Sequence, residues 1–113
     1  LGKILKKQTI FSERVNGEFK LRRNFQIKKG IKVLIVEDVI TTGKSSLECL
    51  ELVKANNADI VGFACIIDRS NGKSGIKDKI ISQVKLDIPT YKKENLPKEL
   101  QFIEAVKPGS RNL

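Results

Sequence analysis

Two apolar runs dominate the sequence and limit the folds that it can adopt. The first covers residues 31–36 and is interrupted only by Lys32, and the second covers residues 60–67. Short, continuous apolar runs are typical of strands that are buried on both faces, as in a parallel sheet. We therefore expect two buried, parallel strands in an α/β fold.

A helical pattern lies between these two runs. Residues 45–55 repeat apolar side chains at helical spacing and place charged side chains on the other face. Asn56-Asn57 ends the pattern just before the second run begins. The order of strand, helix and strand predicts a βαβ unit with a right-handed crossover. We expect a mostly parallel sheet with flanking helices.

Asn16-Gly17 is the strongest turn signal in the N-terminal part of the chain. Both residues tolerate the positive φ of a type I′ turn, and Phe19 and Leu21 alternate with charged residues behind it. We therefore expect a β-hairpin within residues 11–25. The other expected elements are a strand at residues 8–11, a helical turn at residues 76–81, a strand at residues 84–88 and a short helix at residues 97–102.

The composition predicts a single domain, residues 1–113, with a net charge of +9 that attracts anions. Base-stacking aromatic residues are scarce, which argues against a nucleic-acid partner. No apolar run approaches the roughly 20 residues needed to cross a bilayer, so we expect no membrane partner. Cys49 and Cys65 have no CxxC neighbour and the chain has no histidine, so we expect no zinc site. Both thiols are expected to be reduced, in a cytoplasmic protein.

The stretch VLIVEDVITTGKSS, residues 33–46, carries the strongest chemical signal. Ligands of parallel sheets bind beyond the carboxyl ends of the strands, where Glu37 and Asp38 stand. Paired acids suit the vicinal hydroxyls of a ribose, or a metal ion. The turn that follows offers hydroxyls, the close backbone approach of Gly43 and the positive end of a helix, which together suit a phosphate. The pattern predicts a site for a ribose 5-phosphate.

Three other interpretations of this stretch were weighed. An ordinary strand-to-helix turn with a capping Thr or Ser explains one hydroxyl residue but not the whole set. The letters GKSS resemble the end of a P-loop, but that motif needs a glycine where Asp38 stands. VLIVED also resembles the first strand of receiver domains, and Lys107-Pro108 resembles their late lysine-proline pair, but the acceptor-aspartate loop of those domains is missing.

Residues 33–45 closely resemble the phosphoribosyl pyrophosphate (PRPP) binding motif of the type I phosphoribosyltransferases. Within that family, three further pieces resemble the orotate phosphoribosyltransferases: IFSERVNGEFKLRRNF upstream, Asp68-Arg69 after the second strand, and the VKPGSRNL ending. The resemblance implies transfer of a phosphoribosyl group from PRPP to orotate, giving orotidine 5′-monophosphate and pyrophosphate in pyrimidine biosynthesis. It also implies a homodimer, with Mg²⁺ carried by PRPP and no direct metal ligand on the chain.

The resemblance assigns roles to individual residues. Glu37 and Asp38 match the acids that hold the ribose hydroxyls, and residues 41–45 match the 5-phosphate loop. Thr41 and Arg69 match positions that contact orotate. The full PRPP set is Glu37, Asp38, Val39, Ile40, Thr41, Thr42, Gly43, Lys44 and Ser45. Candidates in a mobile loop that meets the pyrophosphate are Arg14, Lys20, Arg22 and Arg23.

Two alternatives to the orotate enzyme stay open, a non-catalytic PRPP-binding regulator and another type I phosphoribosyltransferase. A receiver-like signalling domain is a third and less favoured one. The resemblance corresponds to the C-terminal half or so of such an enzyme, and only one phosphate-cradling turn is visible. We therefore expect that these 113 residues alone do not catalyse the transfer.

Overall fold

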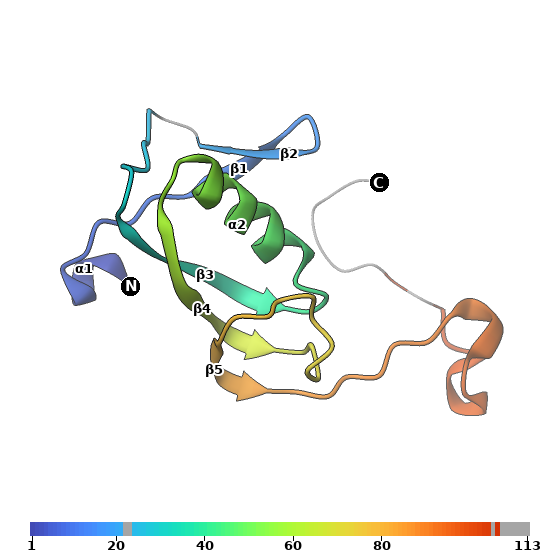
Figure 1. Cartoon of the computed structure of the whole chain (residues 1–113). Helices are drawn as coiled ribbons and strands as arrows, with labels where there is room; N and C mark the ends of the chain where they lie inside the picture. Colours follow the sequence, from blue (N-terminus) through green and yellow to red (C-terminus); the bar gives the residue numbers. More distant parts are fainter. Residues whose placement is uncertain (22–23, 105, 107–113) are drawn as a thin grey trace.

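Three parallel strands and one long helix form the centre of the structure, a computed structural model (Figure 1). It describes residues 1–21, 24–104 and 106. The elements are, in chain order, α1 (Gly2–Leu5), β1 (Ser12–Val15), β2 (Glu18–Leu21), β3 (Lys32–Ile40), α2 (Lys44–Ala55), β4 (Asp59–Asp68), β5 (Ile80–Lys85) and two 3₁₀ turns (Lys93–Asn95 and Lys98–Leu100).

The sheet has the strand order β3-β4-β5, and both pairings are parallel. The register aligns Ile35 with Phe63 and Phe63 with Ile80, so one row of large side chains crosses the sheet. This row faces α2, whose Leu50 and Val53 are buried against it. The core consists of Ile27, Ile35, Ile40, Leu50, Val53, Ala58, Phe63 and Cys65. The predicted α/β fold with a mostly parallel sheet is confirmed.

The other face of the sheet is apolar but exposed, so the expectation that the strands are buried on both faces is wrong. Successive side chains of a strand point to opposite faces. Val36, Ala64 and Ile81 therefore form the outward row, and Val36 and Ile81 are 49% and 56% exposed. Apolar residues on both faces explain why the strands appear in the sequence as continuous apolar runs. Within the described residues, only the face toward α2 is covered.

The predicted hairpin is present and packs on α2. Strands β1 and β2 pair antiparallel, and Asn16 and Gly17 both have positive φ angles of 51° and 88°. The Arg14 guanidinium forms an ion pair with Glu48 of α2. A second contact joins the hydroxyl of Ser12 to the thiol of Cys49 at 3.3 Å. These two contacts hold the hairpin against α2. Figure 1 shows the hairpin beside this helix.

Several predicted elements differ from the structure. The predicted strand at residues 8–11 is wrong, because the hairpin ladder begins at Ser12. The helical turn predicted at residues 76–81 is also wrong, because Ile80 and Ile81 pair with β4 and start β5.

The C-terminal predictions were also only partly right. The strand predicted at residues 84–88 overlaps β5 at residues 84 and 85, and the short helix predicted at residues 97–102 is reduced to the 3₁₀ turn Lys98–Leu100. Lys107-Pro108 and the rest of the C-terminal tail lie outside the described residues. No helix of the described part of the chain is long and apolar enough to span a membrane.

We expect Phe63→Ala to lower the free energy of unfolding by about 3–5 kcal/mol, because Phe63 is only 1% exposed and lies at the centre of the core. Ile66→Ala, a matched change on the opposite face of the same strand, should cost about 0.5 kcal/mol or less, since Ile66 is 59% exposed. Urea unfolding followed by circular dichroism measures both. Equal losses for the two variants would contradict the placement of the core.

Candidate functional site

Gly43 joins the end of β3 to the start of α2 in a conformation that favours glycine. It caps the N-terminus of α2 with a φ of 78° and is buried. A Cβ added there would lie 3.0 Å from Cγ1 of Ile76 and 3.2 Å from Cβ of Ser74. The connection between β4 and β5 therefore packs directly under this turn, and a larger residue at position 43 would separate the two segments.

The turn before α2 presents groups that suit an anion. The first amides of a helix have no partner within the helix. The capping residue Gly43 has no side chain to offer those of α2, and the N–H of Lys44 makes only a long hydrogen bond, 3.4 Å, to the hydroxyl of Thr42. The hydroxyls of Thr41, Thr42 and Ser45 are on exposed residues, and so is the ammonium of Lys44. Residues 41–45, predicted as the phosphate loop, thus lie together at the positive end of the helix.

Ser46 differs from the other hydroxyl residues of the stretch. It is only 2% exposed, and its hydroxyl donates a hydrogen bond to Oε1 of Glu37 at 3.3 Å. The sequence pattern counts the Ser46 hydroxyl among the donors for a phosphate, whereas the structure buries this hydroxyl beside Glu37. The available signal was helical periodicity, since residues 46, 50 and 53 fall on one face of α2 and all three are buried.

Glu37 and Asp38, the predicted ribose acids, occupy different environments. Neighbouring side chains of a strand point to opposite faces, and accordingly Glu37 is half-buried beside α2 while Asp38 is exposed. Oδ1 of Asp38 accepts a hydrogen bond from the backbone N–H of Val39 at 2.7 Å. Both acids belong to the same end of β3, but only Asp38 is freely open to solvent.

Burial raises the pKa of the Glu37 carboxyl. The hydrogen bond from Ser46 acts in the opposite direction, and the negative charge of Asp38 adds to the increase. Glu37 therefore ionises less readily than an ordinary glutamate. The ionised form of Glu37 therefore lowers the stability of the folded chain.

The last two residues of β3, Val39 and Ile40, differ in their exposure to solvent. Val39 is 36% exposed, whereas Ile40 is 1% exposed and belongs to the core. Ile40 therefore offers a ligand only its backbone, and that backbone is already used in part. Its carbonyl accepts a hydrogen bond from the backbone N–H of Arg69 at 2.8 Å.

Arg69, predicted to contact orotate, lies just beyond the end of β4. Its bond to Ile40 places it beside the residue that precedes Thr41. The Nε atom of Arg69 is buried and has no hydrogen-bond partner among the described residues. A buried N–H donor without a partner is rare in folded proteins and suits a site that an anionic ligand completes.

The segment that follows Arg69 contacts the phosphate loop a second time. The backbone N–H of Gly75 donates to the carbonyl of Thr42 at 3.2 Å, and Ile76 packs under Gly43. The structure therefore brings the two predicted binding segments, residues 41–45 and Arg69, to one edge of the sheet.

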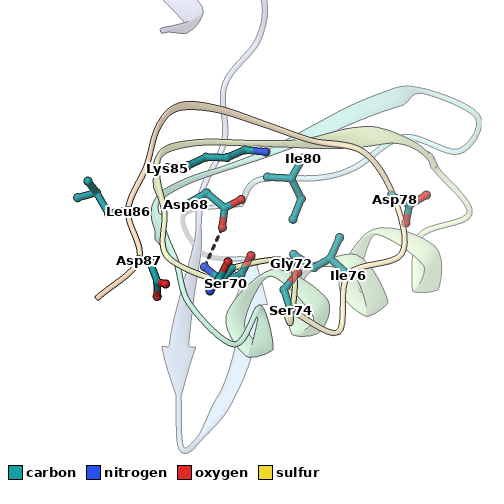
Figure 2. Close-up of a pocket in the computed structure, with 11 residues that line it drawn as sticks. Asp68, Ser70, Gly72, Ser74, Ile76, Asp78, Ile80, Lys85, Leu86 and Asp87 are labelled. Carbon is teal, nitrogen blue, oxygen red and sulfur yellow. Dashed lines mark hydrogen bonds between the residues drawn. The ribbon is translucent and has the colours of Figure 1, made fainter. Parts of the chain in front are cut away.

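A cavity of about 470 Å³ lies between the β4–β5 connection and the strands (Figure 2). Asp68, Ser70, Ile76 and Lys85 are among the residues that line it. None of the predicted site residues does so, although the cavity adjoins Arg69 through Asp68 and Ser70. Thr42 and Lys44 instead line a shallow hollow of about 540 Å³ on the outer side of α2.

The structure describes two of the four predicted mobile-loop residues, Arg14 and Lys20. Arg14 is engaged with Glu48, and it also lies over the Phe19 ring at 4.5 Å. Lys20 is exposed, with its Nζ atom 3.5 Å from a carboxylate oxygen of Glu18. Arg22 and Arg23 lie outside the described residues. Among the residues that are described, no three Cys, Asp or Glu side chains come together as a possible metal site.

The family comparison and the individual relatives both identify phosphoribosyltransferases as similar to this chain. The phosphoribosyl transferase domain family matches residues 3–102. The orotate phosphoribosyltransferase of Parvibaculum lavamentivorans is 46% identical over 112 residues, which cover 99% of this chain and 58% of that protein. The orotate phosphoribosyltransferase of Methylorubrum extorquens is 50% identical over 107 residues, covering 94% of this chain and 55% of that protein. The chain thus spans somewhat more than half the length of these curated relatives.

A solved structure shares the fold. The crystal structure of adenine phosphoribosyltransferase from Thermoanaerobacter pseudethanolicus matches with a TM-score of 0.53 at 20% identity. The match covers 69% of this chain and 48% of that one. At this identity the match supports the arrangement of strands and helix and nothing further.

We expect Gly43→Ala to destabilise the chain more than Gly72→Ala. Both glycines have a positive φ, 78° and 72°, so the backbone strain is similar. Only at Gly43 would the new Cβ meet other atoms, whereas at Gly72 there is nothing within 4 Å. Urea unfolding of the two variants isolates the contact with Ile76. Equal destabilisation would mean that the loop packing is looser than the structure shows.

We expect Glu37→Gln to stabilise the chain at neutral pH. Because the pKa of Glu37 is raised in the folded chain, the fold favours the protonated form, and stability is lost as the pH rises through that pKa. Glutamine stays neutral and avoids this loss. The gain over wild type should vanish below the ordinary glutamate pKa of 4.5. Thermal unfolding at several pH values measures it.

The matched control is Glu51→Gln on the exposed side of α2. The Glu51 carboxylate pairs with the Lys54 ammonium at 3.0 Å, so its replacement should bring no gain at any pH. A loss of stability for Glu37→Gln at pH 7 would contradict the assignment of a desolvated, destabilising carboxylate.

Proposed function

The chain belongs to the phosphoribosyltransferase family, and on that premise we propose that it carries the PRPP and orotate sites of an enzyme that transfers the phosphoribosyl group of PRPP to orotate. The products are orotidine 5′-monophosphate and pyrophosphate, in pyrimidine synthesis. The names of the two relatives described above support orotate as the acceptor. The residues at the carboxyl edge of the sheet support one phosphate at the turn before α2 and one carboxylate at Arg69.

The observation that carries the proposal is the position of Arg69. Its backbone bond to Ile40 brings it next to the phosphate loop, and its buried Nε lacks a partner among the described residues. Orotate carries a carboxylate, and a guanidinium can hold a carboxylate by two parallel hydrogen bonds. Thr41, the first residue after Ile40, supplies a second donor to the same ligand.

PRPP would occupy the neighbouring segment. The 5-phosphate binds at residues 41–45, where helix amides, hydroxyls and the Lys44 ammonium are available. Exposed Asp38 accepts hydrogen bonds from a ribose hydroxyl, and half-buried Glu37 holds the second hydroxyl from the side of α2. Val39 and Ile40 contribute backbone only. This division is consistent with the different burial of the two acids.

The reaction forms one bond and breaks another at the same carbon. N1 of orotate attacks C1 of PRPP with inversion, the C1–O bond breaks, pyrophosphate leaves with the bonding electrons, and the N1 proton is lost. Positive charge develops on the ribose ring, which nearby carboxylates favour. Holding the two substrates in line supplies much of the rate.

Mg²⁺ is proposed as a companion of PRPP, neutralising pyrophosphate and ribose oxygens. The exposed carboxylate of Asp38 fits this arrangement, since it can face a hydrated ion that the substrate brings. The homodimer, the cytoplasmic location and the absence of nucleic-acid and membrane partners stay predictions. The assignment of residues 1–113 to part of a phosphoribosyltransferase domain, its C-terminal half with the PRPP-binding core, also stays a prediction.

A non-catalytic PRPP-binding regulator is the main alternative, because it would need the same phosphate loop. Formation of orotidine 5′-monophosphate from PRPP, orotate and Mg²⁺ by the full-length protein distinguishes the enzyme from such a regulator, whereas we expect none from these 113 residues alone. The receiver-domain hypothesis is overturned by the family match over residues 3–102.

We expect Arg69→Ala to weaken orotate binding by about tenfold or more while leaving the affinity for ribose 5-phosphate within about twofold. Losing a hydrogen bond between charged groups costs about 1.5–3 kcal/mol, and only orotate uses this one. Calorimetric titration with each ligand measures the difference. Lys73→Ala, which removes an exposed positive charge from the same connection, is the control and should change neither affinity. Equal losses for both ligands would point to a structural role for Arg69.

A further inference from the structure

Asp68 is a buried acid to which the proposed chemistry gives no role. It is the last residue of β4, directly before Arg69, and is only 7% exposed. Charged groups are seldom buried unless hydrogen bonds compensate for the loss of water. The Oδ1 atom of Asp68 accepts a hydrogen bond from the backbone N–H of Ser70 at 2.8 Å (Figure 2).

The hydrogen bonds with Ser70 hold the pKa of the Asp68 carboxyl below its usual range. They act against the effect of burial, which raises that pKa, while the charge of Lys85 lowers it to a lesser degree. Asp68 therefore stays ionised near neutral pH, and its main partner is the residue on the other side of Arg69.

Three successive backbone groups around Arg69 are fixed. The carbonyl of Asp68 accepts from the N–H of Leu86 at 2.9 Å, and the N–H of Arg69 donates to Ile40 at 2.8 Å. The N–H of Ser70 is held by the Asp68 carboxylate. The main chain on both sides of Arg69 is thus anchored to β3, to the residue after β5 and to Asp68 itself.

A tight turn follows and extends the same anchoring. The carbonyl of Ser70 accepts from the N–H of Lys73 at 2.8 Å, and Asn71 and Gly72 between them have positive φ angles of 48° and 72°. These hydrogen bonds restrain the backbone that carries Arg69, whereas its Nε has no hydrogen-bond partner among the described residues. A donor on a fixed backbone loses little freedom when it binds a ligand.

We propose that Asp68 is a positioning residue for the acceptor substrate: its carboxylate fixes the turn that aims the Arg69 guanidinium at the orotate carboxylate. This inference rests on the proposed function of Arg69. The carboxylate itself contacts Ser70 and not the substrate, so Asp68 acts through Arg69. Other acids of the cavity, Asp78 and Asp87, are exposed and do not precede the arginine.

The test compares Asp68→Ala with Asp68→Asn in the 113-residue chain. Asparagine keeps an oxygen that can accept from Ser70, and alanine does not. Asp68→Ala should weaken orotate binding by about tenfold and leave the affinity for ribose 5-phosphate within about twofold. Asp68→Asn should recover most of the orotate affinity. A general structural defect would weaken both ligands and would not be rescued selectively by asparagine.

Amide hydrogen exchange supplies a second measurement in the wild-type chain and the asparagine variant, both of which keep an acceptor for Ser70. The Ser70 amide should exchange slowly in both, and in Asp68→Ala it should exchange faster while the Phe63 amide of the core keeps its protection. Rapid exchange of Ser70 in the wild type would overturn the inference without any variant.

The two proposals fail in different ways. If the wild-type chain binds ribose 5-phosphate but not orotate, the proposed acceptor is wrong, and the Ser70 amide still reports whether Asp68 fixes the turn. If the wild type binds orotate and Asp68→Ala binds it equally well, the positioning role is overturned while the proposed function stands.

Discussion

The parallel pairing of β3 with β4 determines everything else at the functional edge of the molecule. Parallel strands end at the same edge of a sheet, and here the register sets Ile40 opposite Asp68. The next hydrogen bond, from the N–H of Arg69 to the carbonyl of Ile40, continues that pairing past the end of β4. Groups 29 positions apart in the sequence, Ile40 and Arg69, thereby become neighbours. The turn that is predicted to bind a phosphate and the arginine are thereby brought to the same edge by a backbone hydrogen bond.

The parts of this arrangement that the sequence predicts are those with a local physical signal. Asn16-Gly17 determines its own turn, and continuous apolar runs identify strands that carry apolar side chains on both faces, although the runs do not reveal that one face is exposed. Strand β5 was misassigned because Ile80 and Ile81 acquire strand structure from pairing with β4, which no local pattern reveals. The burial of Asp68 is equally non-local, since it arises from packing against the β4–β5 connection. The burial of Ser46 could have been predicted from the helical periodicity of α2, which places it on the same face as Leu50 and Val53.

The carboxyl groups of Glu37 and Asp68, both at this edge of the sheet, have pKa values that the fold shifts in opposite directions. Burial raises the pKa of Glu37, whose single partner Ser46 compensates only in part. Hydrogen bonds with Ser70 lower the pKa of Asp68 in spite of deeper burial. Asp68 is hydrogen-bonded by both the hydroxyl and the backbone N–H of Ser70 and lies near the positive charge of Lys85. Glu37 is hydrogen-bonded by Ser46 alone and lies near the negative charge of Asp38. Glu37 therefore destabilises the fold at neutral pH, which is expected of a group kept for a ligand, whereas Asp68 stabilises its own turn.

The predicted phosphate loop, residues 41–45, and the segment that follows Arg69 pack directly against each other. The N–H of Gly75 bonds to Thr42, and Ile76 fills the space that a side chain at Gly43 would need. Neither segment can shift far without disturbing the other, because close-packed contacts transmit displacement. The glycine at position 43 serves both purposes: it permits the positive φ at the start of α2 and leaves room for the connection that supports the arginine.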